Sequence, residues 1–392
     1  MTLLPISDDV DEFRVQVRAW LDEHLVGEFA ENLGVGAVDD AVAFDLRTRW
    51  DKELAAAGLL AITWPEEYGG RGAPLYHEVV LNEELAAARA PYRAGVHGLE
   101  LFGPTLLMYG SDEQKRHFLP PIAAGDVFWG QGFSEPEAGS DLASLRTRAT
   151  LEGDEWVIDG QKIWMTMGMH AHWLYALCRT EPGSSRHKGL SLLMIPVDQP
   201  GVDVRPIRNL AGEVDFAEVF LTGARTAAEN VVGPVGDGWR VGMGALSVER
   251  GALMMPSQLR YQQEIEEALD VARQGGVPAG LRDALVDSWI AVRLILENNA
   301  RTIEEVRQGV EPGPQATTAK LFAAVEHQRM LERAVDALAE TGTTAGEDYT
   351  LHPFQRAFLV SRAATIYGGS AQVQRNLISE RLLGMPREPR PA

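Results

Sequence analysis

The stretch from Trp129 to Asp141, WGQGFSEPEAGSD, decides the fold more than any other segment of the sequence. A short strand-like run leads into a proline and then into a turn of small residues. This order suits a backbone edge that approaches a flat cofactor and a phosphate group together. Two further distinctive segments follow it, GQKIWMT at 160–166 and YGGSAQVQRN at 367–376. We therefore expect the chain to build a cofactor-binding edge around the first segment.

The sequence on either side of this stretch has the pattern of a β domain. From about residue 125 to residue 233, short apolar runs such as WVI (156–158) and LSLLMI (190–195) alternate with turn residues. Short runs with regular turn signals are typical of antiparallel sheets. We predict a β domain over residues 126–233.

The two flanking regions have a helical period. Asp8 is the expected N-cap of a first helix, and a second helix is expected at about 41–57. Ser111 and Gln114 have the spacing of a capping box. Beyond residue 238 we expect helices at about 239–274, 279–308, 315–340 and 353–383, which are long enough to pack as a bundle.

Composition limits the classes of partner. The 392-residue chain is 45% hydrophobic and has a mean hydropathy of −0.13, as expected for a globular protein of two or three domains. Its formal net charge is −20, which argues against nucleic acid and anionic membranes as partners. An anionic small ligand needs only local positive charge and stays compatible with this balance.

The cysteine content and the N-terminal segment predict neither a disulfide framework nor a zinc site nor a secretory signal. Cys178 is the only cysteine, so a disulfide framework or a cysteine zinc site within one chain is excluded, and no metal is expected. We interpret it as a small buried hydrophobe. The segment Met1–Phe13 lacks a basic-then-apolar signal, and no apolar run is long enough for a bilayer, so a cytoplasmic location is expected.

The order and spacing of the three segments resemble those of the acyl-CoA dehydrogenase family of flavoproteins, over nearly the whole chain. The resemblance implies an α+β fold with an N-terminal all-α domain (1–125), a middle antiparallel β domain that forms the flavin wall (126–233) and a C-terminal four-helix bundle (234–392). It implies FAD as cofactor, an acyl-CoA as substrate, and electron-transfer flavoprotein or a similar carrier as acceptor. The expected reaction is α,β-dehydrogenation to the trans-2-enoyl-CoA, in fatty acid or steroid side-chain degradation.

The resemblance also implies roles for individual residues. Ser134 stands where a Thr usually meets flavin N5, and Trp164 and Thr166 match the residues that cover the isoalloxazine ring. Ser140 stands where a Ser contacts the bound nucleotide ligands, cofactor and substrate alike. The implied flavin contacts are Gln131, Phe133, Ser134, Ser140, Trp164, Thr166, Ser370 and Gln372. Two alternatives stay open: Trp164 as a core residue, and 134–136 as a plain turn.

The catalytic base of the family has two known positions. Many members carry a Glu in a turn that here reads YGGS, with Gly368 in place of the Glu. Other members carry it on an earlier helix before an Arg, which corresponds here to Glu249 and Arg250. We therefore predict Glu249 as the base, Gly368 as an N–H donor to the thioester oxygen and Arg250 as a CoA contact. An exposed helical Glu249–Arg250 ion pair is the alternative.

The part of the family pattern that binds the adenosine half of FAD is not intact. The region 261–293 contains no Phe, and 338–346 reads LAETGTTAG without the usual Gln. This loss resembles actinobacterial steroid side-chain acyl-CoA dehydrogenases, some of which are α2β2 heterotetramers. A homo-oligomer is the alternative. Two other functions stay open: a flavin oxidase or monooxygenase on the same fold, and a non-catalytic or FAD-sharing subunit of a heteromer.

Overall fold

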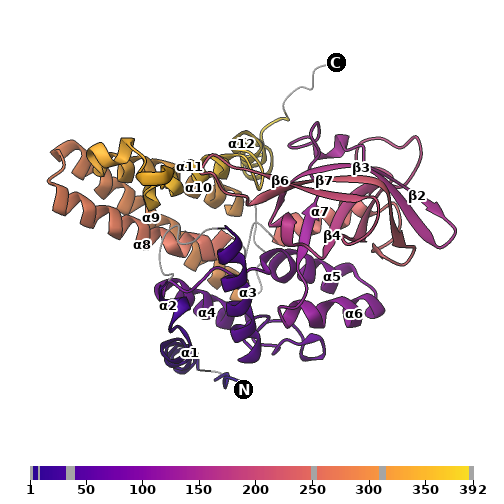
Figure 1. Cartoon of the computed structure of the whole chain (residues 1–392), viewed down its shortest axis with the longest axis horizontal. Helices are drawn as coiled ribbons and strands as arrows, with labels where there is room; N and C mark the ends of the chain where they lie inside the picture. Colours follow the sequence, from indigo (N-terminus) through magenta and orange to yellow (C-terminus); the bar gives the residue numbers. More distant parts are fainter. Residues whose placement is uncertain (1–2, 8, 32–39, 249–253, 309–314, 388–392) are drawn as a thin grey trace. The chain divides into compact units, whose positions relative to one another are not determined.

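The computed structural model describes residues 3–7, 9–31, 40–248, 254–308 and 315–387. The chain divides into two units (Figure 1). The first unit comprises residues 1–8, 39–78 and 91–249, and the second comprises residues 9–38, 79–90 and 250–392. The β region and the helices that flank it belong to the first unit, and the long C-terminal helices belong to the second.

The centre of the first unit is a sheet that has eight strands in the described part of the chain. Seven of them lie in the order β6-β7-β3-β2-β4-β5-β8, and β1 pairs with β4. The strands are β1 (Trp129–Gly132), β2 (Arg148–Glu152), β3 (Glu155–Thr166), β4 (Trp173–Arg179), β5 (Leu190–Pro196), β6 (Val202–Ile207), β7 (Phe216–Ala227) and β8 (Val231–Val232).

The predicted antiparallel domain is confirmed with one modification. Most neighbouring strands run antiparallel, but β1 is parallel to β4, and β2 meets β4 in parallel at Arg148. β1 and β2 thus follow one another along β4 in the same direction, and the loop 133–147 connects them. That loop contains the middle of the sequence motif.

The core of the sheet lies on β3, β4, β5 and β7. Leu174, Leu193 and Val219 are fully buried, and β4 is buried on both faces, as its continuous apolar run indicates. Cys178 lies in the same core, and burial raises the pKa of its thiol to about 12. This confirms its interpretation as a buried hydrophobe.

Helices complete the first unit. They are α3 (Asp40–Ala56), α5 (Gly103–Tyr109), α6 (Asp112–Ala123) and α7 (Gly238–Val248), with a π-helical turn at His97–Phe102. The predicted capping box at the start of α6 is confirmed: Ser111 and Gln114 exchange backbone-to-side-chain hydrogen bonds of 3.0 and 3.2 Å. The Gln114 amide also donates to the carbonyls of Glu229 and Val231, which ties α6 to the start of β8.

The second unit is helical. It contains α1 (Val10–His24), α2 (Glu28–Glu31), part of α4 (Leu75–Ala87), α8 (Met254–Gly275), α9 (Ala279–Arg307), α10 (Gln315–Ala337), α11 (Pro353–Ser361) and α12 (Ala371–Leu377). Helices α8 to α11 share an apolar core that includes Ile265, Leu285 and Leu331, as expected for a bundle. The predicted N-cap of α1 was one residue early, since Asp9 accepts the capping bonds from Asp11 and Glu12.

The prediction of one continuous helix over 353–383 is wrong. Helix α11 ends at Ser361, and α12 begins only after Ser370, whose hydroxyl accepts from the N–H of Val373. Between them Gly368 and Gly369 have φ angles of 60° and 91°, the left-handed region that favours glycine. The apolar period continues across this segment, but two consecutive left-handed residues cannot continue a right-handed helix. In the described residues, no helix is long and apolar enough to span a membrane.

Candidate active site

Strand β1 is packed tightly on one face and carries an unsatisfied donor. A Cβ at Gly130 would lie 2.4 Å from the Met165 sulfur, and one at Gly132 would lie 2.9 Å from Ala176. The two glycines therefore let β1 lie close to β3 and β4. Gln131, between them, points to the opposite face because side chains alternate along a strand. Its amide nitrogen is buried and has no hydrogen-bond partner in the part of the chain that the structure describes.

A buried ion pair supports the residues that follow β1. Lys162 is fully buried in β3, and its ammonium donates to the Phe133 carbonyl (3.2 Å), the Glu135 carboxylate (2.8 Å) and the Leu177 carbonyl (2.7 Å). Glu135 also accepts from the backbone N–H groups of Arg146 (2.6 Å) and Thr147 (2.9 Å). Burial alone would raise the pKa of Glu135, but Lys162 and these donors hold it below its ordinary value.

Ser134 lies between Phe133 and Glu135, two of the three residues that accept from Lys162. Its carbonyl accepts from the N–H of Ile163 at 3.0 Å, which joins the end of β1 to β3. Glu135 and Ala138 exchange backbone hydrogen bonds of 3.0 and 3.1 Å, so the segment after Ser134 is indeed a tight turn. The turn is not a plain one, since its Glu135 carboxylate is bound by the fully buried Lys162.

Trp164 is a surface residue with a constrained backbone. Its φ is 62°, and its side chain is 58% exposed although both neighbouring inward positions of β3 are buried. The pairing of β3 with β7 is irregular between Lys162 and Met165, and this irregularity turns Trp164 outward, edge-on to Phe216. The alternative that Trp164 is a core residue is therefore wrong. A large residue at positive φ is an outlier that the surrounding structure must hold, and such outliers cluster at functional sites.

Two buried side chains, those of Gln374 and Lys320, bind the backbone of the Gly368 turn in the second unit. Gln374 donates to the carbonyls of Gly368 (2.9 Å) and Gly369 (3.2 Å), and Lys320 donates to Gly369 (2.8 Å) and Ala364 (3.0 Å). The carbonyls are thus bonded, whereas no acceptor among the described residues takes the N–H of Gly368. The turn is therefore able to offer an N–H to a ligand. The Ser370 hydroxyl caps α12, and Gln372 is exposed.

Glu249 and Arg250 lie outside the described residues, which resume at Met254 after Val248. Their predicted roles as base and CoA contact remain predictions. Of the other predicted residues, Gln131, Phe133, Ser134, Ser140, Trp164 and Thr166 belong to the first unit, and Gly368, Ser370 and Gln372 belong to the second. Within the first unit, the bond from Ile163 to Ser134 brings the end of β1 beside the segment that carries Trp164.

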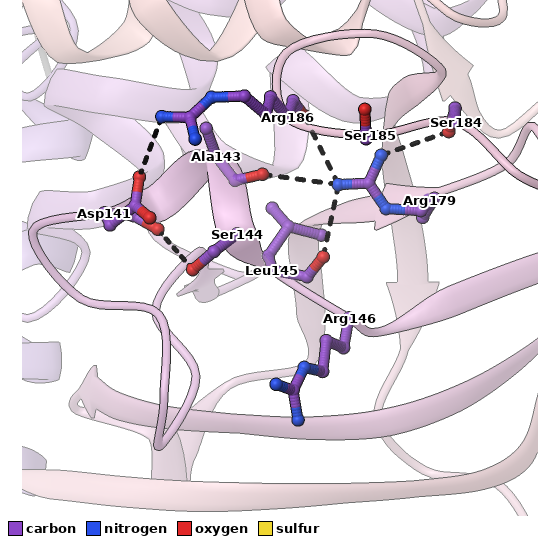
Figure 2. A pocket seen from close by; sticks show the side chains of 9 residues that line it. All are labelled: Asp141, Ala143, Ser144, Leu145, Arg146, Arg179, Ser184, Ser185 and Arg186. Atoms are coloured by element: carbon purple, nitrogen blue, oxygen red, sulfur yellow. Dashed lines mark hydrogen bonds and ion pairs between the residues drawn. The ribbon is translucent and has the colours of Figure 1, made fainter. Parts of the chain in front are cut away.

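A pocket of about 360 Å³ lies in the first unit, next to the end of the sequence motif (Figure 2). It is lined by Asp141, Ala143, Ser144, Leu145, Arg146, Arg179, Ser184, Ser185 and Arg186. Arg179 holds its wall together, since its guanidinium donates to Ser184 and to the carbonyls of Ala143, Leu145, Arg186 and Lys188. Ser140 itself is exposed, one residue before this lining.

Two further arginines of the pocket make ion pairs that are exposed to solvent. Arg186 lies 3.9 Å from Asp141, and both side chains are more than half exposed. Arg146 pairs with Glu137 at 2.6 Å, again with both side chains largely exposed, and Figure 2 shows its guanidinium directed away from Arg179. Exposed pairs of this kind contribute little stability, so the two guanidinium groups can exchange partners for an anion.

The geometry of the first unit fits a flavin. A flavin would supply the acceptor that the Gln131 amide nitrogen lacks among the described residues, and the exposed Trp164 offers an aromatic face. Sequence reasoning missed Lys162 and Glu135, because a Lys in the middle of a strand and a Glu directly before a Pro do not by themselves indicate that the two side chains meet. It also missed the pocket arginines, which have no motif of their own.

Comparison with protein families gives three consecutive matches. Residues 7–126 match the N-terminal domain of acyl-CoA dehydrogenase, residues 130–224 match the middle domain, and residues 236–383 match the C-terminal domain. Together these matches span most of the chain, in the order that the resemblance implies.

Individual relatives agree with the domain matches. The chain is 45% identical to the acyl-CoA dehydrogenase IpdE1 of Mycobacterium tuberculosis over 383 residues, with 97% of this chain and 99% of the relative covered. It is 44% identical to IpdE1 of Mycolicibacterium smegmatis at the same coverage. Among solved structures, the Tcur3481-Tcur3483 steroid ACAD superposes with a TM-score of 0.85 at 28% identity, covering 98% of this chain and 100% of that one.

The ChsE4-ChsE5 complex from Mycobacterium tuberculosis also matches, with a TM-score of 0.81, 28% identity and coverage of 98% and 100% of the two chains. Domain matches, relatives and architecture lead to the same conclusion. The chain belongs to the acyl-CoA dehydrogenase family, a family of flavin-dependent oxidoreductases that act on acyl-CoA.

Proposed function

We propose that the chain catalyses α,β-dehydrogenation of an acyl-CoA thioester to the trans-2-enoyl-CoA, with FAD as its cofactor. The observation that carries the proposal is the junction at which the Ser134 carbonyl, after β1, accepts from the N–H of Ile163 in β3; this junction is called the flavin edge below. The Gln131 amide nitrogen in β1 is buried without a partner among the described residues, and Trp164, next to Ile163, is exposed at positive φ. A donor edge with an aromatic cover is the arrangement that a planar flavin requires.

The proposed chemistry divides between a base and a hydrogen-bond donor. Glu249 takes the α-proton, and its apolar sequence neighbours (Leu246, Val248, Leu253) would favour a basic carboxylate. Negative charge then develops on the thioester oxygen, where the N–H of Gly368 donates to it. FAD, which Gln131, Ser134 and Trp164 would help to hold, would supply the acceptor for the β-hydrogen as hydride, and an electron-transfer flavoprotein or a similar carrier would remove the electrons. The new Cα–Cβ double bond completes the balance.

The arginine-lined pocket is the proposed site for the anionic part of the CoA. The chain as a whole carries a formal charge of −20, so a polyanionic ligand needs a local concentration of positive charge. Arg146 and Arg186 provide it through guanidinium groups whose present pairs are exposed, and Ser185 adds a hydroxyl group. Ser140 lies at the start of this region and is proposed to contact the nucleotide ligands.

The relatives indicate a substrate class and an assembly. Because one structural relative is a steroid ACAD and another is a complex of two different chains, we propose a steroid-derived acyl group and a heteromeric α2β2 enzyme. The segment 338–346, which lacks the family's Gln, supports a partner chain that completes the adenosine half of the FAD site. A homo-oligomer that binds FAD by itself is the alternative outcome.

The visible spectrum of the purified protein tests this proposal. Under anaerobic conditions, a flavin band that is bleached by steroid-derived acyl-CoAs supports a dehydrogenase with that substrate class. A colourless protein that acquires the band only with a partner chain supports the shared FAD site. Glu249→Gln should retain the flavin band and lose its bleaching, and full bleaching would contradict the role of Glu249. Rapid reaction of the reduced flavin with oxygen would favour an oxidase or monooxygenase.

A further inference from the structure

The hydrogen bonds around Lys162 connect three separate segments. Its ammonium has three protons, and each has an acceptor: the carbonyl of Phe133 after β1, the carboxylate of Glu135 in the turn and the carbonyl of Leu177 in β4. The side chain is 0% exposed, so water cannot replace any of these acceptors. The positions of Phe133 and Glu135 relative to the sheet are therefore fixed by one buried atom, and Ser134 lies between them.

The Glu135 carboxylate extends this network toward the pocket. One oxygen accepts from Lys162 and from the N–H of Thr147, and the other accepts from the N–H of Arg146. Arg146 lines the pocket. The carbonyl of Thr147 in turn accepts from the N–H of Arg179, which holds the pocket wall. A continuous chain of hydrogen bonds thus leads from the flavin edge to the pocket, all of it inside the first unit.

The stability of the fold alone does not account for a buried ion pair between Lys162 and Glu135. Two charges removed from water lose their hydration, and well-packed apolar side chains of similar volume fill such a space at least as stably. An apolar pair cannot make the directional hydrogen bonds that hold backbone groups in a defined orientation. Lys162 and Glu135 make five different hydrogen bonds to defined backbone groups and to each other, and each of these has a fixed distance and angle.

We propose that Lys162 and Glu135 are positioning residues that set the geometry of the flavin edge at Ser134 and couple it to the arginine-lined pocket. The inference rests on the function proposed above. Neither residue contacts the reacting atoms. Lys162 fixes the backbone on which Ser134 is presented, and Glu135 joins that backbone to the segment that carries Arg146. Binding of an anion at the pocket thereby changes the geometry of the flavin edge.

Three variants of the purified holoenzyme test the proposal. Glu135→Gln preserves the shape of the side chain and removes its charge. Lys162→Met with Glu135→Leu replaces the pair by apolar side chains. Glu84→Gln is the matched control, because Glu84 is also buried and bound by two cations, Arg14 and Arg18, but lies in the second unit.

The expected result separates stability from function. Glu135→Gln should shift the absorption band and the midpoint potential of the bound flavin and weaken CoA binding, measured by calorimetry, about tenfold. Turnover should fall by roughly 100-fold, the effect of a small misplacement of the reacting groups. The apolar double variant should have the melting temperature of the wild type but not its flavin spectrum. Glu84→Gln should lower the melting temperature and leave both the spectrum and CoA binding unchanged.

Two outcomes overturn the inference. One is a Glu135→Gln enzyme whose spectrum, potential and CoA affinity equal those of the wild type while its melting temperature falls as in Glu84→Gln. The other is a double variant that recovers flavin spectrum and stability together. A wild-type enzyme that binds FAD and turns over acyl-CoA keeps the proposed function intact in both cases. Failure of the wild type in those two measurements instead contradicts the proposed function itself.

Discussion

Two groups of buried acids in the first unit differ in the direction of their pKa shifts. Beneath the flavin edge the pKa of Glu135 is held below its ordinary value, in spite of burial. Near the π-helical turn, burial raises the pKa values of Asp51 and Glu100 to about 7. Glu135 contacts the Lys162 ammonium at 2.8 Å, whereas the carboxylate of Asp51 accepts from the neutral N–H groups of Ala94 and Gly95.

The comparison shows that a fully buried cation together with two backbone N–H donors outweighs the burial of Glu135, whereas the two backbone N–H donors of Asp51 do not outweigh its burial. Glu100 is an intermediate case, with Arg93 at 3.2 Å and side chains that are about one-tenth exposed. There burial is the largest effect on the pKa, and the charges of Glu78 and Asp51 also oppose ionisation. The flavin edge is therefore built to keep its acid ionised at neutral pH, and the region of the π-helical turn is not.

The largest expected effect comes from removal of the cation. Lys162→Met leaves the Glu135 carboxylate buried without its partner, and loss of one member of a buried pair costs about 3–5 kcal/mol. The pKa of Glu135 should then rise, as at Asp51, so that the stability of the variant falls as pH increases through that raised pKa. Urea unfolding at pH 5 and pH 8 measures this, with a larger loss relative to wild type at pH 8. Equal losses at both pH values would contradict the comparison.

A smaller and opposite effect is expected at Asp51. A folded-state pKa of about 7, above the ordinary value of 3.8, means that the native state binds an extra proton between these values, so stability declines as pH rises from 4 to 7. Asp51→Asn keeps an oxygen for the N–H groups of Ala94 and Gly95 and cannot ionise. The variant should be more stable than wild type at pH 8, on the order of 2 kcal/mol, and equal to it at pH 4. A variant that is less stable than wild type at pH 8 would show that ionised Asp51 does not destabilise the folded state.

Trp164 extends the comparison from charge to backbone strain. Its φ of 62° costs a tryptophan about 1 kcal/mol or more and costs glycine nothing, and its exposed side chain loses little packing when removed. Trp164→Gly should therefore raise the free energy of unfolding by about 1 kcal/mol and weaken FAD binding at the same time. Denaturation and flavin titration measure the two effects. Weaker FAD binding together with lower stability would indicate a packing role instead.

The smallest effect on stability is expected at the pocket. Arg186 and Asp141 are 3.9 Å apart and exposed, so Arg186→Ala should leave the free energy of unfolding unchanged. The KM for acyl-CoA should rise several-fold at low salt, and the difference from wild type should shrink as salt is added. Steady-state kinetics at two ionic strengths checks this. A fall in kcat at unchanged KM would place the role of Arg186 elsewhere than in CoA binding.

Periodicity predicted the regular parts of the fold. The helices expected at 279–308 and 315–340 are close to α9 (Ala279–Arg307) and α10 (Gln315–Ala337), because long amphipathic segments are governed by burial of one face. The capping box of Ser111 and the buried run of β4 were equally local signals.

Features that depend on distant residues could not be predicted in this way. The strand pattern around Lys162 gives no sign that its acceptors come from three segments, so a lysine there is expected at the surface. The irregular pairing of β3 and β7 turns Trp164 outward, and a period of two cannot show that. At Gly368 and Gly369 the local signal was present, but the apolar period around it favoured a helix. The role of Glu249 still depends on the family resemblance alone.

The sealed position of Cys178 has a practical consequence for labelling. It is the only cysteine in the sequence, it is fully buried, and with a pKa of about 12 its reactive thiolate fraction at pH 7 is on the order of 10⁻⁵. The folded protein thus presents no competing thiol to a maleimide reagent. A single cysteine introduced at Ser185, in the pocket wall, would carry a fluorophore alone and report occupancy of the pocket in real time, without a cysteine-free background.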